Sequence, residues 1–306
     1  MMLKARLLII TMALQTMALS SALAEWRKEL GTFRIGLIEA QAKPFSPEDL
    51  NRLKSAMSGA LGIPVEIFRA RDFPSLIDAH VSSRIEYAIY SSAAYATAWL
   101  ACQCVEPVAF PVNADGTSGY KTMIFARTGL KLNDLPQSKG VGIPGRDSLM
   151  GFGVPLASLS VSGNVLSGNE KWLSFAENAS GTIEAYRSVS QDAFVAAVPA
   201  ALSMDSAVPK LPWLGELTGE SEKPVAIWES AVVPFGPHAV RKNLAPEAKE
   251  LAADILAKLH ETDPELAELL LPDEAVSFRP VEHGAYTLAV NAAKALAAVS
   301  GGAPGP

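Results

Sequence analysis

Apolar residues follow two patterns along the chain. Short unbroken runs rich in Val, Ile, Phe and Tyr indicate buried strands, and apolar residues spaced three or four apart indicate amphipathic helices. Residues 46–62 give a clear helix signal, with Ser46 as the N-cap, Pro47 in the first turn and Gly62 at the end. The pattern predicts strands or extended segments at 33–40, 64–70, 86–92, 105–112, 120–127, 140–145, 171–176, 193–199 and 224–241, and helices at 46–62, 73–84, 93–102, 182–191, 245–261 and 286–299, with one more that ends near 159.

Strands and helices alternate at these lengths, which indicates an α/β fold with mostly parallel sheets flanked by helices. A chain of 306 residues is too long for one small core, so we expect two lobes. In open sheets of this kind, ligands bind beyond the carboxyl ends of the strands, where helices begin. The strand-to-helix connections, or joins, where we expect a binding site are therefore the loop after Leu37 and residues 71–73, 91–92, 146–151 and 180–182.

The first 24 residues have the composition of a secretory signal peptide. Lys4 and Arg6 precede a mostly apolar stretch at 7–19, and Ala22-Leu23-Ala24 forms a small-x-small cleavage site. A membrane anchor is the alternative, but the apolar run is short and is broken by polar residues. No cysteine lies near the cleavage site, so we expect a mature periplasmic protein without a lipid anchor.

The net charge of the chain restricts the classes of molecule that it can bind. The chain has a formal net charge of −6, and removal of Lys4 and Arg6 with the signal peptide makes it more negative. This balance argues against nucleic acid and anionic membranes as partners, but it is compatible with a small anionic ligand at a locally positive site. Residues 300–306, rich in Gly and Pro, have the composition of a disordered tail.

Cys102 and Cys104 are the two cysteines of the chain and form a Cys-x-Cys pair. Export permits oxidation, yet a bridge between them closes a small, strained ring. Two half-buried thiols are the alternative, and neither a second pair nor a nearby histidine supports a metal site. We assign the pair no function.

The stretch PGRDSLMGFG, residues 144–153, shows the chemistry that several joins share. Ser148 and Gly151 lie just before a predicted helix. In the same way, Ser91 and Ser92 precede the predicted helix at 93–102. A helix N-terminus leaves N–H groups unpaired and carries a partial positive charge, so several such ends facing one cleft form an oxyanion receptor. The serine hydroxyls add hydrogen-bond donors, and Arg146 adds a positively charged guanidinium group that can donate two hydrogen bonds to one anion. The alternative for each join is an ordinary N-cap without ligand contact.

Three segments, taken in order, resemble the phosphonate- or phosphite-binding periplasmic proteins of ABC transporters. They are FRIGLIEAQ…LGIPVEIFRARDFPSLIDAH…EYAIYSSAAYATA, YKTMIFAR…LNDLPQSKGVGIPGRDSLMGFGVPLASL and ESAVVPFGPHAVRKNLAPEAKELAADILAKL, which span about residues 33–290. The resemblance implies a two-lobed type 2 periplasmic-binding fold whose chain crosses between the lobes twice, at TMIFAR and AIWESAVVP. Mapped onto this sequence, residues 25–124 and 230–299 form lobe one, and residues 125–229 form lobe two.

The resemblance also implies a ligand-binding set. The lobe-two loop of the family usually reads Asp-Ser-Thr-Ser-Gly, whereas Leu149 and Met150 replace two of its hydroxyls here. Each lost hydrogen bond to a charged group costs about 1.5–3 kcal/mol, so phosphonate binding is weakened unless Arg146 compensates or the ligand is larger, less charged or partly apolar. The expected ligand-binding residues are Phe73, Ser91, Ser92, Tyr95, Tyr120, Arg146, Ser148, Leu149, Met150, Gly151 and Thr182.

These features predict a periplasmic receptor that delivers a phosphonate, phosphite or phosphate ester to an ABC permease in the inner membrane. We expect a monomer that needs no cofactor and no metal. A sensor that passes its closed state to a membrane kinase is the alternative. An enzyme is disfavoured, since the sequence lacks Gly-x-Ser-x-Gly, His-Glu-x-x-His and P-loop motifs. We further expect His80 to be exposed or partly buried, His238 to have a structural role, and the fluorescence of Trp228 to respond to closure.

Overall fold

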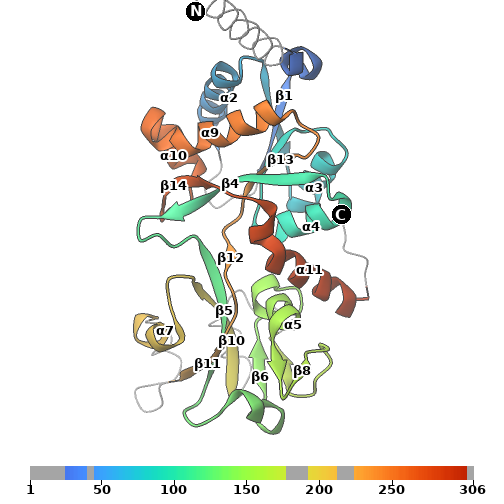
Figure 1. Ribbon diagram of the computed structural model, residues 1–306, viewed down its shortest axis with the longest axis vertical. Coiled ribbons are helices and arrows are strands. Elements are labelled where there is room, and N and C mark those ends of the chain that lie inside the picture. Colours follow the sequence, from blue (N-terminus) through green and yellow to red (C-terminus); the bar gives the residue numbers. More distant parts are fainter. Residues whose placement is uncertain (1–24, 40–44, 177–191, 212–223, 302–306) are drawn as a thin grey trace, which may run out of the picture.

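The computed structural model describes residues 25–39, 45–176, 192–211 and 224–301 of the chain. The predicted signal peptide, the predicted helix at 182–191 with Thr182, and most of the predicted tail lie outside these residues. The described part contains two six-stranded sheets, one above the other in Figure 1, with helices packed against them. None of the described helices is both long enough and apolar enough to cross a membrane.

The first sheet combines strands from both ends of the chain. Its strands are β1 (Phe33–Ile38), β2 (Val65–Ala70), β3 (Tyr87–Ile89), β4 (Val105–Asn113), β13 (His238–Arg241) and β14 (Ala275–Pro280). In space they follow the order β14-β4-β13-β3-β1-β2. β1 pairs parallel with β2 and β3, whereas β13 and β14 pair antiparallel with their neighbours. The return segment of the chain therefore completes the sheet that the N-terminal segment begins.

The second sheet is formed by the middle of the chain. Its strands are β5 (Gly119–Ala126), β6 (Val141–Ile143), β9 (Leu173–Phe175), β10 (Ala193–Pro199), β11 (Val225–Glu229) and β12 (Val233–Pro234). In space β11-β5-β10-β6-β9 lie side by side, and β12 also pairs with β5. The predicted lobe limits fall within β5 and at the end of β11, and they stay a prediction.

Both sheets are mixed, so the expectation of mostly parallel sheets was wrong. Parallel pairing occurs among β1, β2 and β3 and among β6, β9 and β10. The other pairs in these two sheets are antiparallel, because the segments that cross between the sheets and return enter each sheet in the opposite direction.

The helices mostly follow the predicted pattern. Their bounds are α2 (Pro47–Leu61), α3 (Phe73–Val81), α4 (Ser92–Cys102), α5 (Val154–Ser158), α7 (Met204–Lys210), α9 (Pro246–Thr262), α10 (Pro264–Leu270) and α11 (Thr287–Val299), with 3-10 turns at Leu132–Gln137 and His283–Tyr286, a π-helical turn at Leu149–Gly153 and a small hairpin of β7 (Ser160–Val161) and β8 (Asn164–Val165). The caps of α2 are those predicted: the Ser46 Oγ accepts from the Asp49 N–H at 3.1 Å, and Gly62 adopts a φ of 70°. α7, α10 and β14 were not predicted.

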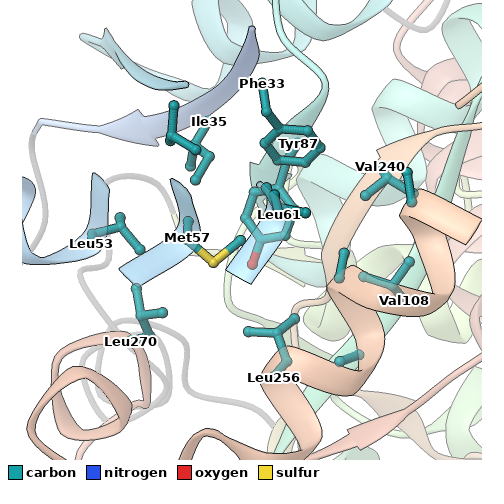
Figure 2. Close-up of a cluster of buried hydrophobic side chains, with 14 of the residues drawn as sticks. Phe33, Ile35, Leu53, Met57, Leu61, Tyr87, Val108, Val240, Leu256 and Leu270 are labelled. Carbon is teal, nitrogen blue, oxygen red and sulfur yellow. The ribbon is translucent and has the colours of Figure 1, made fainter. Parts of the chain in front are cut away.

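Apolar side chains cover both faces of the first sheet. On one face, Phe33 and Ile35 of β1 pack with Met57 and Leu61 of α2 and with Leu256 of α9, as Figure 2 shows. Each such side chain, when fully buried, stabilises the fold by roughly 1.5–3 kcal/mol. On the other face, α3, α4 and α11 form a second apolar cluster. Helices therefore cover both faces of the first sheet.

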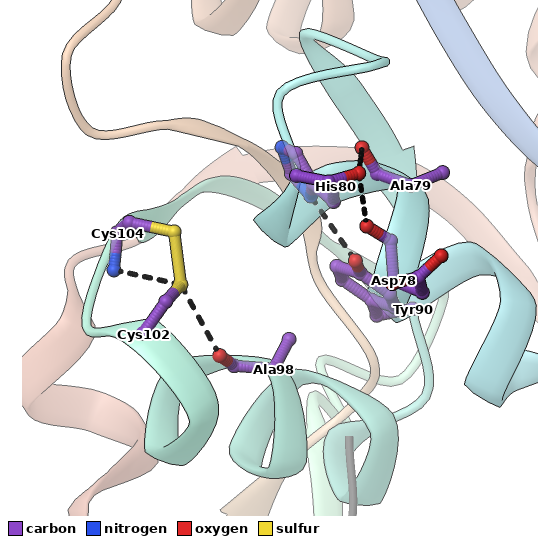
Figure 3. Close-up of a disulfide and its surroundings, with 8 residues drawn as sticks. Asp78, Ala79, His80, Tyr90, Ala98, Cys102 and Cys104 are labelled. Carbon is purple, nitrogen blue, oxygen red and sulfur yellow. Dashed lines mark hydrogen bonds between the residues drawn. A yellow bond between two sulfur atoms is a disulfide. The ribbon is translucent and has the colours of Figure 1, made fainter.

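Cys102 and Cys104 form a disulfide at the end of α4 (Figure 3). Of the two possibilities that the sequence left open, a local disulfide and two half-buried thiols, the structure therefore contains the disulfide. Their Cα atoms lie 5.0 Å apart, within the usual range for a disulfide. Gln103 between them adopts a φ of 50°, in the left-handed region, and this turn brings the two side chains to the same side.

Candidate functional site

Two antiparallel segments connect the sheets. β5 pairs with β12 near its start and with β11 near its end, in registers that include Tyr120 with Val233 and Met123 with Glu229. Between these pairs, the Thr122 N–H donates to the Ser230 Oγ at 3.0 Å, and the Ser230 N–H donates back to the Thr122 carbonyl at 2.9 Å. The two predicted crossings therefore form one continuous two-stranded connection.

The N-terminus of α4 is attached to this connection. Ser91 is the N-cap, and its Oγ accepts from the Ala94 N–H at 3.1 Å. The Ser92 Oγ donates to the Pro234 carbonyl of β12 at 2.5 Å. Gly236 passes so close to the same turn that a Cβ there would lie 1.9 Å from the Tyr90 carbonyl oxygen. The crossing segment thus passes directly beside the tip of α4.

The loop at 144–153 is attached to the connection from the other side. The Ser148 Oγ accepts from the Gly151 N–H at 2.9 Å, and the turn that follows is a π-helical turn that leads into α5. The Thr122 Oγ1 of β5 donates to the Met150 carbonyl at 2.7 Å. The predicted helix that ends near 159 therefore exists, but its first turn is wider than an α-helix.

The two tips are bonded to two paired strands, the α4 tip to β12 and the 148–151 loop to β5. Ser92 bonds to Pro234, which pairs with Gly119, and Met150 bonds to Thr122. Gly119 and Thr122 are three residues apart on one strand, a span of about 10 Å. The structure therefore attaches the first turn of α4 and the loop after β6 to neighbouring points of one strand pair, β12 with β5. Before the structure, only the resemblance to the family suggested that these two tips lie near each other.

Leu149 and Met150 are half-buried and pack against the apolar cluster of α3, α4 and α11. This contact gives a structural reason for apolar side chains at two positions where related loops carry hydroxyls. Gly151 is buried, and a Cβ on it would lie 2.8 Å from the Ser148 Oγ and 2.9 Å from the Pro144 Cδ. The glycine is therefore needed for the cap of this turn to form.

Other predicted residues lie elsewhere. Tyr95, one of the expected ligand-binding residues, is fully buried, and its hydroxyl lies 2.8 Å from the His283 Nδ1, so its side chain belongs to the core in this structure. Burial raises the pKa of Tyr95.

The other expected residues lie on separate elements. Phe73 is the first residue of α3 and is 37% exposed. The Arg146 guanidinium lies 3.8 Å from the centre of the Phe175 ring. Thr182 lies outside the described residues.

A cavity of about 290 Å³ opens at the carboxyl ends of β3 and β4. Two of the predicted residues, Ser91 and Tyr120, line it, whereas Ser148 does not. The sequence reasoning missed Asn113, Phe235 and Glu274, which also line it. The rule that ligands bind beyond strand ends could have indicated Asn113 at the end of β4. Phe235 and Glu274 carry no local signal, because the return of the chain brings them to this edge.

Two histidines of the first half, His80 and His238, are buried. His238 lines the cavity from within the sheet, where the Tyr87 hydroxyl contacts its Nδ1, and His80 lies 3.1 Å through Nδ1 from the Tyr90 hydroxyl. Burial lowers the pKa of each histidine to about 3, so both are neutral at physiological pH. His238 is buried and also lines the cavity, so its structural role stays a prediction, whereas the expectation that His80 is exposed or partly buried was wrong.

The comparisons with known proteins agree with this architecture. A family model described as the periplasmic substrate-binding protein of phosphonate ABC transporters matches residues 35–286. A Xanthomonas citri protein solved with bound ATP is similar in structure, with a TM-score of 0.59 and 14% identity over 89% of this chain and 98% of that one. A binding-protein component of a phosphonate ABC transporter from Pseudomonas aeruginosa is also similar, with a TM-score of 0.46 and 19% identity over 83% of each chain.

Among curated protein sequences, none matches this chain significantly. At this low identity, the likeness to the Xanthomonas citri structure establishes the fold alone, which is that of type 2 periplasmic binding proteins. The family model, in contrast, spans most of the chain, from β1 to the turn before α11. The chain therefore belongs to the family of periplasmic substrate-binding proteins of phosphonate ABC transporters.

Proposed function

We propose that this protein binds a small phosphorus oxyanion, a phosphonate, phosphite or phosphate ester, between its two sheets and delivers it to an ABC permease in the inner membrane. The observation that carries the proposal is that the α4 tip is bonded to β12 and the 148–151 loop to β5, the strand with which β12 pairs. A ligand held by both contacts both halves at once, and such contacts stabilise the closed form over the open form.

The oxyanion end of the ligand is placed at the first turn of α4. The unpaired N–H groups of this turn and the positive end of the helix dipole favour an anion, and Ser91 adds a hydroxyl donor. Ser148 and Arg146 are the proposed contacts from the second half, and the bond from Thr122 of β5 to the Met150 carbonyl of the same loop supports this assignment. The ATP in the related Xanthomonas citri structure supports a ligand with phosphate groups, because phosphate is the same type of oxyanion.

The proposed location is the periplasm. Members of this family act there, and the first 24 residues have the pattern of a cleavable signal peptide. The lobe limits proposed from the sequence, 25–124 with 230–299 and 125–229, place each sheet largely in one lobe. In this arrangement β5 and β12 form the hinge, since they connect the sheets.

Calorimetric titration with phosphite, methylphosphonate and, as a control anion, sulfate tests the proposal. We expect the phosphorus oxyanions to bind, and Ser91→Ala to weaken them by about 10- to 100-fold, the range for one hydrogen bond to a charged group. Ser46→Ala is the matched control, because it also removes the N-cap serine of a helix but lies on α2, away from the crossing. Failure of every phosphorus oxyanion to bind would contradict the proposal.

A further inference from the structure

The disulfide between Cys102 and Cys104 lies at a surface turn of the first half. Cys102 is the last residue of α4, and Cys104 comes directly before β4. Gln103 between them is exposed, and both cysteines are half-buried. Part of each cysteine is thus open to solvent, so a second molecule can reach the bridge.

The turn does not depend on the bridge for its shape. The Gln103 N–H donates to the Trp99 carbonyl at 2.7 Å and so caps the end of α4. The Lys242 N–H, which follows β13, donates to the Cys104 carbonyl at 2.7 Å. Both hydrogen bonds join backbone groups and remain when the S–S bond breaks. We therefore expect the reduced protein to keep the end of α4 and the start of β4 in place.

The Cys102 sulfur has a hydrogen-bond partner for each form that reduction gives it. The Cys104 N–H donates to the Cys102 Sγ at 3.1 Å, and the Ala98 carbonyl oxygen lies 3.5 Å from the same sulfur (Figure 3). The N–H stabilises a thiolate, since a hydrogen bond to the charged form favours that form. The carbonyl accepts from the S–H of a neutral thiol. The site therefore holds a released Cys102 sulfur with or without its proton.

The fold gives the bridge little protection from reduction. By loop entropy, a disulfide that closes three residues shifts the folding equilibrium by about 15-fold, compared with about 3,000-fold for a loop of about 100 residues. Because folding and oxidation form one thermodynamic cycle, folding favours the oxidised pair over the reduced pair by the same factor. The ease of reduction therefore differs by only this small factor between the folded protein and the unfolded chain. Exposed bridges of this kind are the labile ones, whereas structural disulfides of secreted proteins resist reduction.

We propose that Cys102 and Cys104 form a thiol–disulfide exchange site that oxidises a partner with two neighbouring thiols. A partner thiolate attacks the Cys104 Sγ, a new S–S bond forms, and the old bond breaks with its electron pair on the Cys102 Sγ. Attack falls on Cys104 because the Cys104 N–H stabilises Cys102 as the leaving thiolate. The second partner thiolate then attacks the partner's own sulfur in the mixed disulfide, and the Cys104 Sγ leaves.

The exchange balances in electrons and protons. The partner loses two electrons and gains a disulfide, and the Cys102–Cys104 pair gains these electrons and becomes two thiols. The two protons that the partner's thiols release are taken up by Cys102 and Cys104, and the negative end of the α4 dipole favours the protonated form of Cys102. This activity goes beyond the proposed function and does not depend on it, because the pair lies at the opposite end of α4 from Ser91.

The equilibrium of reduction tests how far the fold protects the bridge. The full protein is equilibrated with mixtures of reduced and oxidised glutathione, once in buffer and once unfolded in urea, and its free thiols are alkylated and counted by mass spectrometry. We expect the two equilibrium constants for reduction to differ by about 15-fold, and by less than about 100-fold. A larger difference would show that the fold protects the bridge as a structural disulfide, and would overturn the proposal. Loss of the circular dichroism signal on reduction in buffer would also overturn it, since the turn would then depend on the bridge.

A reduced synthetic peptide with a Cys-x-x-Cys pair, kept under argon, tests the transfer itself. The oxidised protein should convert most of the peptide to its disulfide, and one pair of protein thiols should appear for each peptide oxidised. Cys102→Ser/Cys104→Ser should abolish this oxidation, whereas Ser46→Ala, on α2 and away from the pair, should retain it. Equal oxidation by the double variant, or none by the wild-type protein, would refute the exchange site.

A peptide with a single cysteine identifies the attacked sulfur. It stops the reaction at the mixed disulfide, and fragmentation mass spectrometry after an acid quench should locate the peptide on Cys104. Attachment to Cys102 would overturn the assigned order of attack.

Discussion

Single residues decide how closely the crossing segment approaches the α4 tip. Gly236 fits only because it lacks a side chain, since a Cβ would lie 1.9 Å from the Tyr90 oxygen and 2.8 Å from the Ser91 Cα. Both of these are backbone atoms and cannot rotate away. Gly119 is constrained in the same way by the Val233 oxygen, at 2.3 Å. These glycines keep the connection tight against the proposed oxyanion site.

Gly236→Ala should destabilise the protein by about 1–3 kcal/mol, the usual cost of overpacking, and should weaken ligand binding through the displaced Ser91. Urea denaturation measures the first effect and calorimetry the second. Gly59→Ala is the control, because Gly59 lies inside α2, where an added Cβ would meet no atom within 4 Å, and it should stabilise by about 0.5–1 kcal/mol. A neutral Gly236→Ala would contradict the close approach.

The buried histidines make stability depend on pH. Both have pKa values lowered by burial from 6.5 to about 3, so the unfolded chain takes up protons below pH 6.5 while the folded chain does not. The free energy of unfolding should therefore fall as the pH falls, by about 1.4 kcal/mol for each histidine between pH 7.5 and 5.5. His238→Gln should remove about half of this difference, measured by urea denaturation at the two pH values.

The exposed His260 provides the control for this measurement. His260→Gln replaces a histidine that is exposed in the folded protein, so it controls for the substitution itself in the same denaturation measurements. A wild-type protein of equal stability at pH 7.5 and 5.5 would show that the histidines are protonated in the folded state as well.

At the scale of elements, α11 connects the two halves on the side away from the strand pair. It packs against α4 of the first half, and its Ala292 carbonyl lies 3.0 Å from where a Cβ on Gly153 would be. Ala295 and Leu296, further along the helix, contact the apolar cluster of the second sheet. The C-terminal helix therefore contributes to both cores, and the halves are joined by a helix as well as by two strands (Figure 1).

The disulfide at the end of α4 should contribute little to stability. It closes a ring of only three residues, for which loop entropy gives about 1.6 kcal/mol, compared with about 4.7 kcal/mol for a loop of about 100 residues. Cys102→Ser/Cys104→Ser should lower the free energy of unfolding by about that smaller amount and leave ligand binding intact, because the pair lies at the opposite end of α4 from Ser91. A loss of several kcal/mol in urea denaturation would contradict this.

At the scale of the whole molecule, closure should be visible at Trp228. This residue lies on β11 beside a bulge, and it packs both against the cluster of α3, α4 and α11 and against the cluster of the second sheet. A rotation of one half relative to the other changes these contacts. We expect its emission to change when a phosphorus oxyanion binds.

Two tryptophan variants check this assignment. Trp228→Phe should remove the ligand-dependent change in fluorescence, and Trp172→Phe should retain it, because Trp172 packs, within the described part of the chain, against the cluster of the second sheet alone. Ligand binding measured by calorimetry in Trp228→Phe distinguishes a lost signal from lost binding. An unchanged response in Trp228→Phe would place the moving tryptophan elsewhere.

Local sequence signals predicted much of the secondary structure. The N-cap of α2, the start of α4 at Ser92 and the capped turn at Ser148 are all encoded within four or five residues, so the sequence alone reveals them. Tyr95 shows the limit: it lies one turn after a correctly predicted cap, yet its side chain is buried against Tyr286 and His283, nearly two hundred residues away in the chain.

By itself, the sequence determined the alternation of strands and helices, the helix starts with their caps, and the order of segments that marks the family, because periodicity and capping act between near neighbours. Only the tertiary structure decided the mixed direction of the sheets, the π-helical turn at Leu149–Gly153 and the cavity that joins Tyr120 with Phe235 and Glu274. These depend on contacts between segments far apart in the chain, and no local pattern specifies which strand a returning chain will meet.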